Sequence, residues 1–274
     1  MSDLVEYKIV EKVAVISLNR PDKHNAQSPE LLHALDACWT RAAADEHVSV
    51  ILLRANGRNF SAGHDVSSDS AASASNDFSY LEDGIAKQYL WEQRTYFEYS
   101  RKWRNNPKPS IAVVQGACVA AGLMLCWPCD LIVAAENAWF SDPTIIMGIA
   151  GVEYHGHTWE LGARKAKQLL FTADKITATQ AQQLGMVNEV VKADELNEFS
   201  LRLAKRIAGY NLFSLMMAKR VVNQTLDTMG QAAALQAGFD IHEMQHAQCL
   251  AVSGGKSSVL THDVSTLRKN NAKD

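Results

Sequence analysis

The sequence predicts an α/β fold, because short β-branched apolar runs alternate with helical patterns over much of the chain. The runs at residues 13–18 and 48–53 are typical of strands, and the second is apolar enough to be buried on both faces. From about residue 161 onward the apolar spacing is mostly helical. We therefore expect a sheet-containing core followed by a C-terminal helical appendage.

The first elements expected are two strands and a helix. Residues 13–18 should pair with residues 7–10 across the turn at Glu11 and Lys12. The segment 28–30, Ser-Pro-Glu, predicts a helix start, because serine can cap, proline suits the first turn and the acid faces the positive end of the helix dipole. This helix should run to about His47.

The middle of the chain predicts a loop, a long helix and two more strands. Residues 67–75 are nearly all serine and alanine, which is typical of a mobile loop. A helix over about residues 80–103 should end before the prolines at 107 and 109. Strands are expected at residues 111–114 and 130–134.

Three helices and one strand are expected after residue 161. The helices should cover residues 162–171, 177–184 and 195–209, and Thr177 should cap the second of them. The strand should cover residues 186–191.

The composition is that of a soluble globular protein, with 47% hydrophobic and 21% charged residues among 274. A net charge of −3 gives no reason to expect nucleic acid as a partner, and no apolar run has the length of a membrane span. The first residues lack the order of a secretory signal. Together with five cysteines, an odd number, this predicts reduced thiols and a cytoplasmic location.

Two loops of small residues follow strands that we expect to be buried. They are Phe60-Ser61-Ala62-Gly63-His64-Asp65 and Gly116-Ala117-Cys118-Val119-Ala120-Ala121-Gly122. Small residues let backbone N–H groups point outward without side chains in the way. Two such donors on one carbonyl oxygen stabilise the charge that develops there, and losing one costs about 2.7–4 kcal/mol of barrier. Taken separately, each loop could equally be a tight turn or a packing point.

These loops, with their neighbours, resemble those of the crotonase (enoyl-CoA hydratase/isomerase) family. The segment 19–26, N-R-P-D-K-H-N-A, resembles the family's N-R-P-x-x-x-N-A. Residues 60–65 resemble its F-x-A-G-x-D, and residues 115–131 resemble its second glycine loop followed by C-D-x. Phe140-Ser141-Asp142-Pro143 and Gly185-Met186-Val187 continue the likeness, which covers about residues 5–195.

The resemblance implies a crotonase-type spiral of ββα units over residues 1–195, which holds the acyl-CoA site. Residues 196–274 would be a helical region for trimerisation, giving a homotrimer or a hexamer. The oxyanion donors would be the N–H groups of His64 and Ala121. Coenzyme A would enter only as part of the thioester substrate, with no tightly bound cofactor and no metal. Its contacts would include Lys23, His24, Ala26, Ala62, Gly63, His64, Asp65 and Gly122.

The carboxylates used by hydratases of this family are expected at two positions that hold other residues here. One position is Met124 and the other is Thr144. A thioether cannot move a proton at neutral pH, and a threonine hydroxyl is a poor base. The resemblance therefore does not extend to the two-glutamate hydration mechanism.

Glu153 is the candidate for a single proton-transfer residue, because relatives that are not hydratases place their acid or base in this loop. Tyr154, His155 and Asp142 are weaker candidates for assisting it. Alternatively, Glu153 is only a carboxylate near a helix N-terminus. We expect an acyl-CoA enzyme with one acid/base, as in double-bond isomerisation. The alternatives are a non-catalytic acyl-CoA-binding paralogue, or a thioester hydrolase or dehalogenase that uses Glu153.

Other motifs favour structural roles. Cys126 and Cys129 have redox or zinc spacing but lie in what the family makes core. His155 and His157 are not expected to bind metal, and Asp65 is expected to fix a turn. The pair Met216-Met217 and the histidines at 242 and 246 are interpreted as helix packing and surface.

Overall fold

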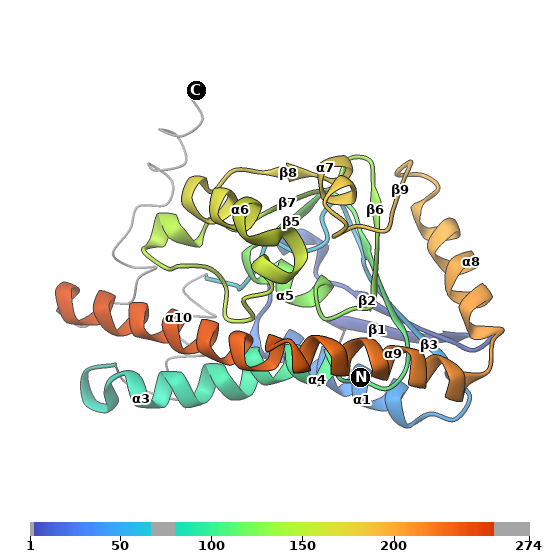
Figure 1. The fold of residues 1–274 in the computed structure, drawn as a ribbon, viewed down its shortest axis with the longest axis horizontal. Helices are drawn as coiled ribbons and strands as arrows, with labels where there is room; N and C mark the ends of the chain where they lie inside the picture. The colour runs from blue at the N-terminus through green and yellow to red at the C-terminus, as the bar shows by residue number, and fades with distance from the viewer. Residues whose placement is uncertain (1–2, 67–79, 255–274) are drawn as a thin grey trace.

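The computed structural model describes residues 3–66 and 80–254, and Figure 1 shows their arrangement. One sheet has six strands in the order β1-β2-β3-β4-β6-β9, and a second has three in the order β5-β7-β8. Two long helices, α3 and α10, lie side by side along one edge of the molecule (Figure 1). The predicted α/β class is confirmed, and the predicted loop at residues 67–75 lies outside the described residues.

The six-stranded sheet is parallel except at one edge, where β1 runs antiparallel to β2 as predicted. Its strands are β1 (Val5–Val10), β2 (Val13–Leu18), β3 (Val50–Ala55), β4 (Ser110–Val114), β6 (Leu131–Ala135) and β9 (Glu189–Val191). The smaller sheet contains β5 (Ala117–Val119), β7 (Trp139–Ser141) and β8 (Ile176–Thr177). The strands β4 and β5 carry the chain into the second small-residue loop.

Both faces of the large sheet are covered, as expected for a mostly parallel sheet. Strand β2 is buried along its whole length, with Ile16 and Leu18 in one hydrophobic cluster and Val13 and Val15 in another. The second cluster includes α8 (Leu196–Ala208), which packs on the sheet. The boundary between a core ending at 195 and a helical region beginning at 196 stays a prediction.

Helix α1 (Pro29–Ala44) begins where the sequence predicts, because the Oγ of Ser28 accepts a hydrogen bond from the N–H of Leu31 at 3.3 Å. It ends at Ala44, three residues before His47, and the backbone of the next residue, Asp45, is extended. The following strand is therefore displaced: β3 covers residues 50–55, not 48–53.

The predicted helix over residues 80–103 is helical but not uniform. Helix α3 (Tyr80–Glu92) continues into a π-helical turn (Gln93–Phe97) and then into α4 (Glu98–Arg104). Across the π turn the ring of Trp91 meets the ring of Tyr96 edge-on, with centroids 4.9 Å apart. The segment ends before the two prolines, as expected.

The later helices follow the prediction, with two longer ones after them. They are α6 (His157–Thr172), α7 (Ala178–Gln183), α8, α9 (Leu212–Thr228) and α10 (Gln231–Ser253). Thr177 and Gln180 form a complete capping box at α7. The predicted strand at 186–191 is shorter, because only residues 189–191 pair. No helix in residues 3–66 and 80–254 is long and apolar enough to cross a lipid bilayer.

Candidate active site

The backbone of His64 is held so that its own N–H faces away from its neighbouring segment. The N–H of Gln27 donates to the carbonyl of Gly63 at 2.8 Å, and the N–H of Asp65 donates to the carbonyl of Gln27 at 3.0 Å. This is a parallel bridge between Gln27 and His64. In such a bridge the bonds to Gln27 are made by the two neighbours of His64, so the N–H and C=O of His64 itself point away from Gln27. The N–H of His64 is thereby directed away from Gln27.

The second loop lies directly against the first. The N–H of Ser61 donates to the carbonyl of Ala117 at 3.1 Å, and the N–H of Val119 donates to the carbonyl of Ser61 at 3.0 Å. A Cβ placed on Gly63 would lie 2.9 Å from the carbonyl oxygen of Val119 and 3.3 Å from the nitrogen of Ala121. The structure therefore brings Gly63, which precedes His64, into contact with the second loop at Ala121.

The N–H of Ala121 lies in the first turn of a short 3-10 helix (Ala120–Gly122), where N–H groups lack helical acceptors. Ala120 has a φ of 49°, a conformation that alanine adopts only at some cost. The roles of His64 and Ala121 as oxyanion donors stay a prediction.

Replacing Gly122 by alanine should lower the free energy of unfolding by about 1–3 kcal/mol. Its backbone is ordinary α-helical, so the loss would come only from crowding: the new Cβ would lie 2.8 Å from the carbonyl oxygen of Ser61. Urea unfolding measures the effect. As a control, Gly209→Ala at the exposed end of α8 should change stability by less than about 0.5 kcal/mol. Equal losses in the two variants would contradict the tight contact between the loops.

Asp65 joins the first loop to the segment expected to contact coenzyme A. Its Oδ2 lies 2.5 Å from Nη1 of Arg20, which also donates to the carbonyl of Ala26 at 3.0 Å. The ion pair agrees with the expected turn-fixing role of Asp65. Lys23, His24 and Ala62 are exposed, and the N–H of Ala62 donates to the carbonyl of His24. Contact of any of these residues with coenzyme A stays a prediction.

Glu153 lies beside the side chain of His64. Its Oε1 is 3.0 Å from Nε2 of His64, and the residue is only 4% exposed. Burial alone would raise the pKa of Glu153, but positive charge on His64 and His242 outweighs burial and holds the pKa below its ordinary value. The ring of His64 also stacks on Tyr96, with centroids 3.9 Å apart. The carboxylate is thus ionised at neutral pH and next to the first loop.

His242 does not lie on the surface, so that part of the interpretation was wrong. His242 on α10 is buried, with its Nε2 3.8 Å from Oε1 of Glu153 and 3.6 Å from Oε2 of Glu92. These carboxylates outweigh the effect of burial and raise the pKa of His242 to about 9. Nε2 of His246 lies 3.0 Å from that of His242. The signal in the sequence was the spacing of two histidines four residues apart on a helix, with one acid between them.

Met124 and Thr144, which stand where the resemblance places glutamates, have different surroundings. Met124 is buried and lines a narrow pocket together with His64 and Tyr96. The hydroxyl of Thr144 donates to Asp142 at 2.7 Å and accepts from the N–H of Gly151 at 3.0 Å. The apolar side chain faces the pocket, and the hydroxyl holds the loop that leads to Glu153.

Asp142 also holds this loop, and its role in assisting Glu153 stays a prediction. It is fully buried and accepts hydrogen bonds from Nε2 of His157 at 2.7 Å and from the N–H of Val152 at 3.1 Å. With Thr144 these contacts fix the start and the end of the 144–152 segment. The ring of His155 packs against that of His157, with centroids 4.4 Å apart. The Nε2 of His157 is thus engaged by Asp142.

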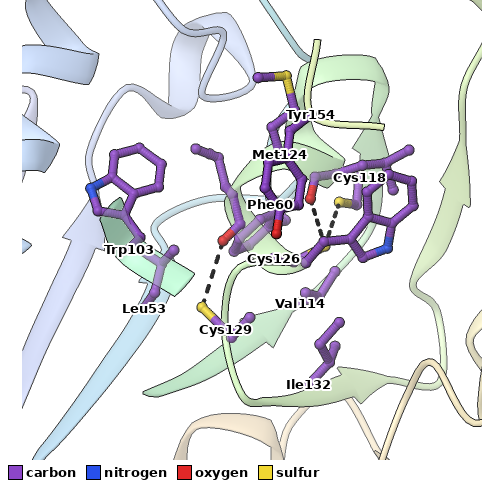
Figure 2. Packing of buried hydrophobic residues seen from close by; sticks show 14 of the residues in the cluster. Leu53, Phe60, Trp103, Val114, Cys118, Met124, Cys126, Cys129, Ile132 and Tyr154 are labelled. Carbon is purple, nitrogen blue, oxygen red and sulfur yellow. Dashed lines mark hydrogen bonds between the residues drawn. The ribbon is translucent and has the colours of Figure 1, made fainter. Parts of the chain in front are cut away.

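The cysteine pair at 126 and 129 lies in the core, as Figure 2 shows. All five cysteines are free and buried. The thiol of Cys126 contacts the sulfur of Cys118 at 3.8 Å, and the thiol of Cys129 donates to the carbonyl of Leu125 at 3.6 Å (Figure 2). Burial raises the pKa of both Cys126 and Cys129. A protonated, buried thiol is a poor nucleophile, which agrees with the expected structural role.

Comparison with known proteins identifies relatives over nearly the whole chain. The family model described as Enoyl-CoA hydratase/isomerase matches residues 8–249. The crystal structure of a probable enoyl-CoA hydratase from Mycobacterium smegmatis is 53% identical, has a TM-score of 0.85, and the match covers 92% of this chain and 98% of that one. EchA13 of Mycobacterium tuberculosis, provisionally named an enoyl-CoA hydratase, is 42% identical over 93% of this chain and 85% of its own.

A relative whose name specifies a substrate has lower sequence identity to this chain. The 2,3-dehydroadipyl-CoA hydratase of Escherichia coli is 34% identical over 87% of this chain and 86% of its own. The family match, the crotonase-type fold of the structural neighbours and the paired loops agree with one another. The chain belongs to the enoyl-CoA hydratase/isomerase family, within the crotonase superfamily.

Proposed function

We propose that this acyl-CoA enzyme stabilises a thioester enolate with the N–H groups of His64 and Ala121 and moves one proton with Glu153. The observation that carries the proposal is the 3.0 Å contact between the Glu153 carboxylate and the side chain of His64. The residue expected to bind the thioester oxygen thereby also touches the residue expected to move the proton. The Glu153 carboxylate is ionised, and an ionised carboxylate can accept a proton from the carbon next to the thioester.

The proposed reaction is a double-bond isomerisation. Glu153 removes a proton from a carbon of the acyl chain as the C–H bond breaks, and the electron pair moves to the thioester oxygen held by the two N–H groups. Protonated Glu153, after exchange of its proton with water, then delivers a proton to another carbon, and the double bond lies one position away. Only one acid/base is needed, which suits a site with a buried methionine at 124 and a loop-fixing threonine at 144.

The binding of coenzyme A and the assembly of the chain are part of this proposal. Lys23 is exposed near His24 and Ala62, where it can meet a phosphate. A trimer is supported by large apolar side chains exposed on the last two long helices, at least half exposed in most cases: Phe213, Val221, Val222, Ile241, Met244 and Val252. A trimer would have about three times the 30.2 kDa mass of the chain. We also keep the cytoplasmic location as a prediction.

Incubating the protein with a panel of enoyl-CoA thioesters in deuterated water tests the reaction. The expected result is deuterium at the α or γ carbon without addition of water, detected by mass spectrometry and NMR. Because the enolate forms only when a C–H bond breaks, exchange requires a proton-transfer residue. Tight binding without exchange would favour a non-catalytic acyl-CoA-binding protein. Release of free coenzyme A would favour a thioester hydrolase that uses Glu153.

A further inference from the structure

A second polar cluster lies behind Glu153, where α3 and α10 run side by side (Figure 1). It contains Glu92 from α3 and His242 and His246 from α10. One ligand atom of each residue lies within 4.8 Å of the others. Glu92 and His242 are buried, and His246 is half-buried. Three groups able to bind a metal thus converge on one point inside the protein.

The two histidines have the spacing of a known metal-binding pattern. Residues 242–246 read His-Glu-Met-Gln-His on one helix. Histidines four residues apart lie on the same face of a helix, and in H-E-x-x-H both bind zinc. A glutamate from elsewhere in the chain is a frequent third ligand beside two histidines. Glu92 supplies that carboxylate from a helix 150 residues earlier in the sequence.

The outer contacts leave the metal-facing atoms in place. Nδ1 of His242 is 2.8 Å from the carbonyl of Gly151, so it donates there as N–H and Nε2 faces the cluster. Nε2 of Gln88 donates to Oε1 of Glu92 at 2.7 Å, and Oε2 receives no hydrogen bond from any described residue. Ligating histidines and carboxylates in metal sites are held by outer hydrogen bonds of this kind.

The distances suit a small ion. Nε2 of His242 lies 3.0 Å from Nε2 of His246 and 3.6 Å from Oε2 of Glu92. Ligands at about 2.0–2.1 Å from a tetrahedral zinc ion lie roughly 3.3–3.5 Å apart. Glu153 adds negative charge, because its Oε1 lies 3.8 Å from Nε2 of His242. The surroundings therefore favour a cation.

We infer that Glu92, His242 and His246 bind a divalent transition-metal ion of the Zn²⁺ class. The ion would lie beside Glu153 but use none of the residues expected to hold the thioester oxygen. The site does not depend on the reaction proposed above. The competing arrangement is a hydrogen-bonded cluster in which protons occupy the same positions.

Metal binding is measured on the full-length protein without a histidine tag, stripped with a chelator and titrated with Zn²⁺ and with Co²⁺. We expect one equivalent of Zn²⁺ with a Kd below about 1 µM. Glu92→Gln and His246→Asn should each weaken binding at least about 100-fold, since outer contacts alone are worth 10–100-fold. His33→Asn, an exposed histidine on α1, should bind as the wild type does. As a second measurement, Zn²⁺ should raise the Tm of the wild type but not that of the ligand variants.

The spectrum of bound Co²⁺ tests which side chains hold the ion. Nitrogen and oxygen ligands are expected, and a thiolate-to-cobalt band would assign the ion to Cys126 and Cys129 and overturn the proposal. Binding weaker than about 100 µM, or wild-type affinity in Glu92→Gln and His246→Asn, would also overturn it. If a ligand variant does not fold, X-ray absorption of the Co²⁺-loaded wild type decides. Two imidazoles around the ion support the site, and fewer refute it.

Discussion

Replacing Glu153 by glutamine is expected to reduce kcat about 100- to 10,000-fold, the usual contribution of one general acid/base. Glutamine has almost the same shape and can still accept a hydrogen bond from His64, but it cannot take up a proton. Binding of the thioester should change little, so KM should stay within about a factor of three of wild type. Deuterium exchange and steady-state kinetics on the thioester that exchanges fastest measure the effect.

A surface glutamate provides the matched control for this substitution. Glu98 pairs with Arg101 on an exposed part of α4, so Glu98→Gln should leave kcat and KM unchanged. Circular dichroism should show that both variants are folded. Full turnover by Glu153→Gln on the true substrate would show that another group moves the proton.

Replacing Asp142 by alanine is expected to lower the free energy of unfolding by about 3–5 kcal/mol, as for a buried charge partner that is removed. The carboxylate accepts hydrogen bonds from His157, Thr144 and the N–H of Val152, and the variant leaves all these donors buried without it. Chemical denaturation measures the loss. The exposed Asp194→Ala should cost less than about 0.5 kcal/mol. Similar losses in both variants would contradict the anchoring role.

The contribution of Asp142 should also depend on pH in a defined direction. Hydrogen bonds from His157 and Thr144 outweigh burial and hold the pKa of Asp142 below its ordinary value of 3.8. The ionised form therefore stabilises the fold above that value, and this stabilisation is lost as the pH falls through the lowered pKa. The Tm of Asp142→Asn should be below that of the wild type near pH 7, and the difference should shrink below about pH 4. A difference in Tm that stays constant from pH 7 to below pH 4 would contradict the stabilising role of the ionised Asp142.

Much of the fold could be predicted, because its signals are local. The cap at Ser28 and the box at Thr177 start their helices as expected, since each depends on side chains within three residues. The two loops could be paired because family likeness supplied a long-range contact that no local pattern contains. The start of β3 was misplaced by two residues, because extended backbone at Asp45 and the strand pairing set it, not apolar character alone.

The candidate site was predicted only in part. Glu153 was expected from its place in the chain, but its contacts with His64 and with the C-terminal helix depend on tertiary packing. His242 was interpreted as helix packing and surface, because its partner Glu92 lies far away in sequence. The role of a buried polar side chain depends on such distant partners, and the periodicity of the sequence does not reveal them.

The π-helical turn at residues 93–97 has a consequence for how this chain could have changed during evolution. A π turn is a bulge in an α-helix, in which one extra residue is inserted and the hydrogen bonds run from residue i to i+5. Deleting that residue would restore a regular helix but rotate everything on one side of it by about 100° relative to the other. Glu92 and Tyr96 could then no longer face His242 and His64 together. Homologues that lack the insertion should therefore differ at all four positions at once, and a gap in an alignment would mark a change of chemistry.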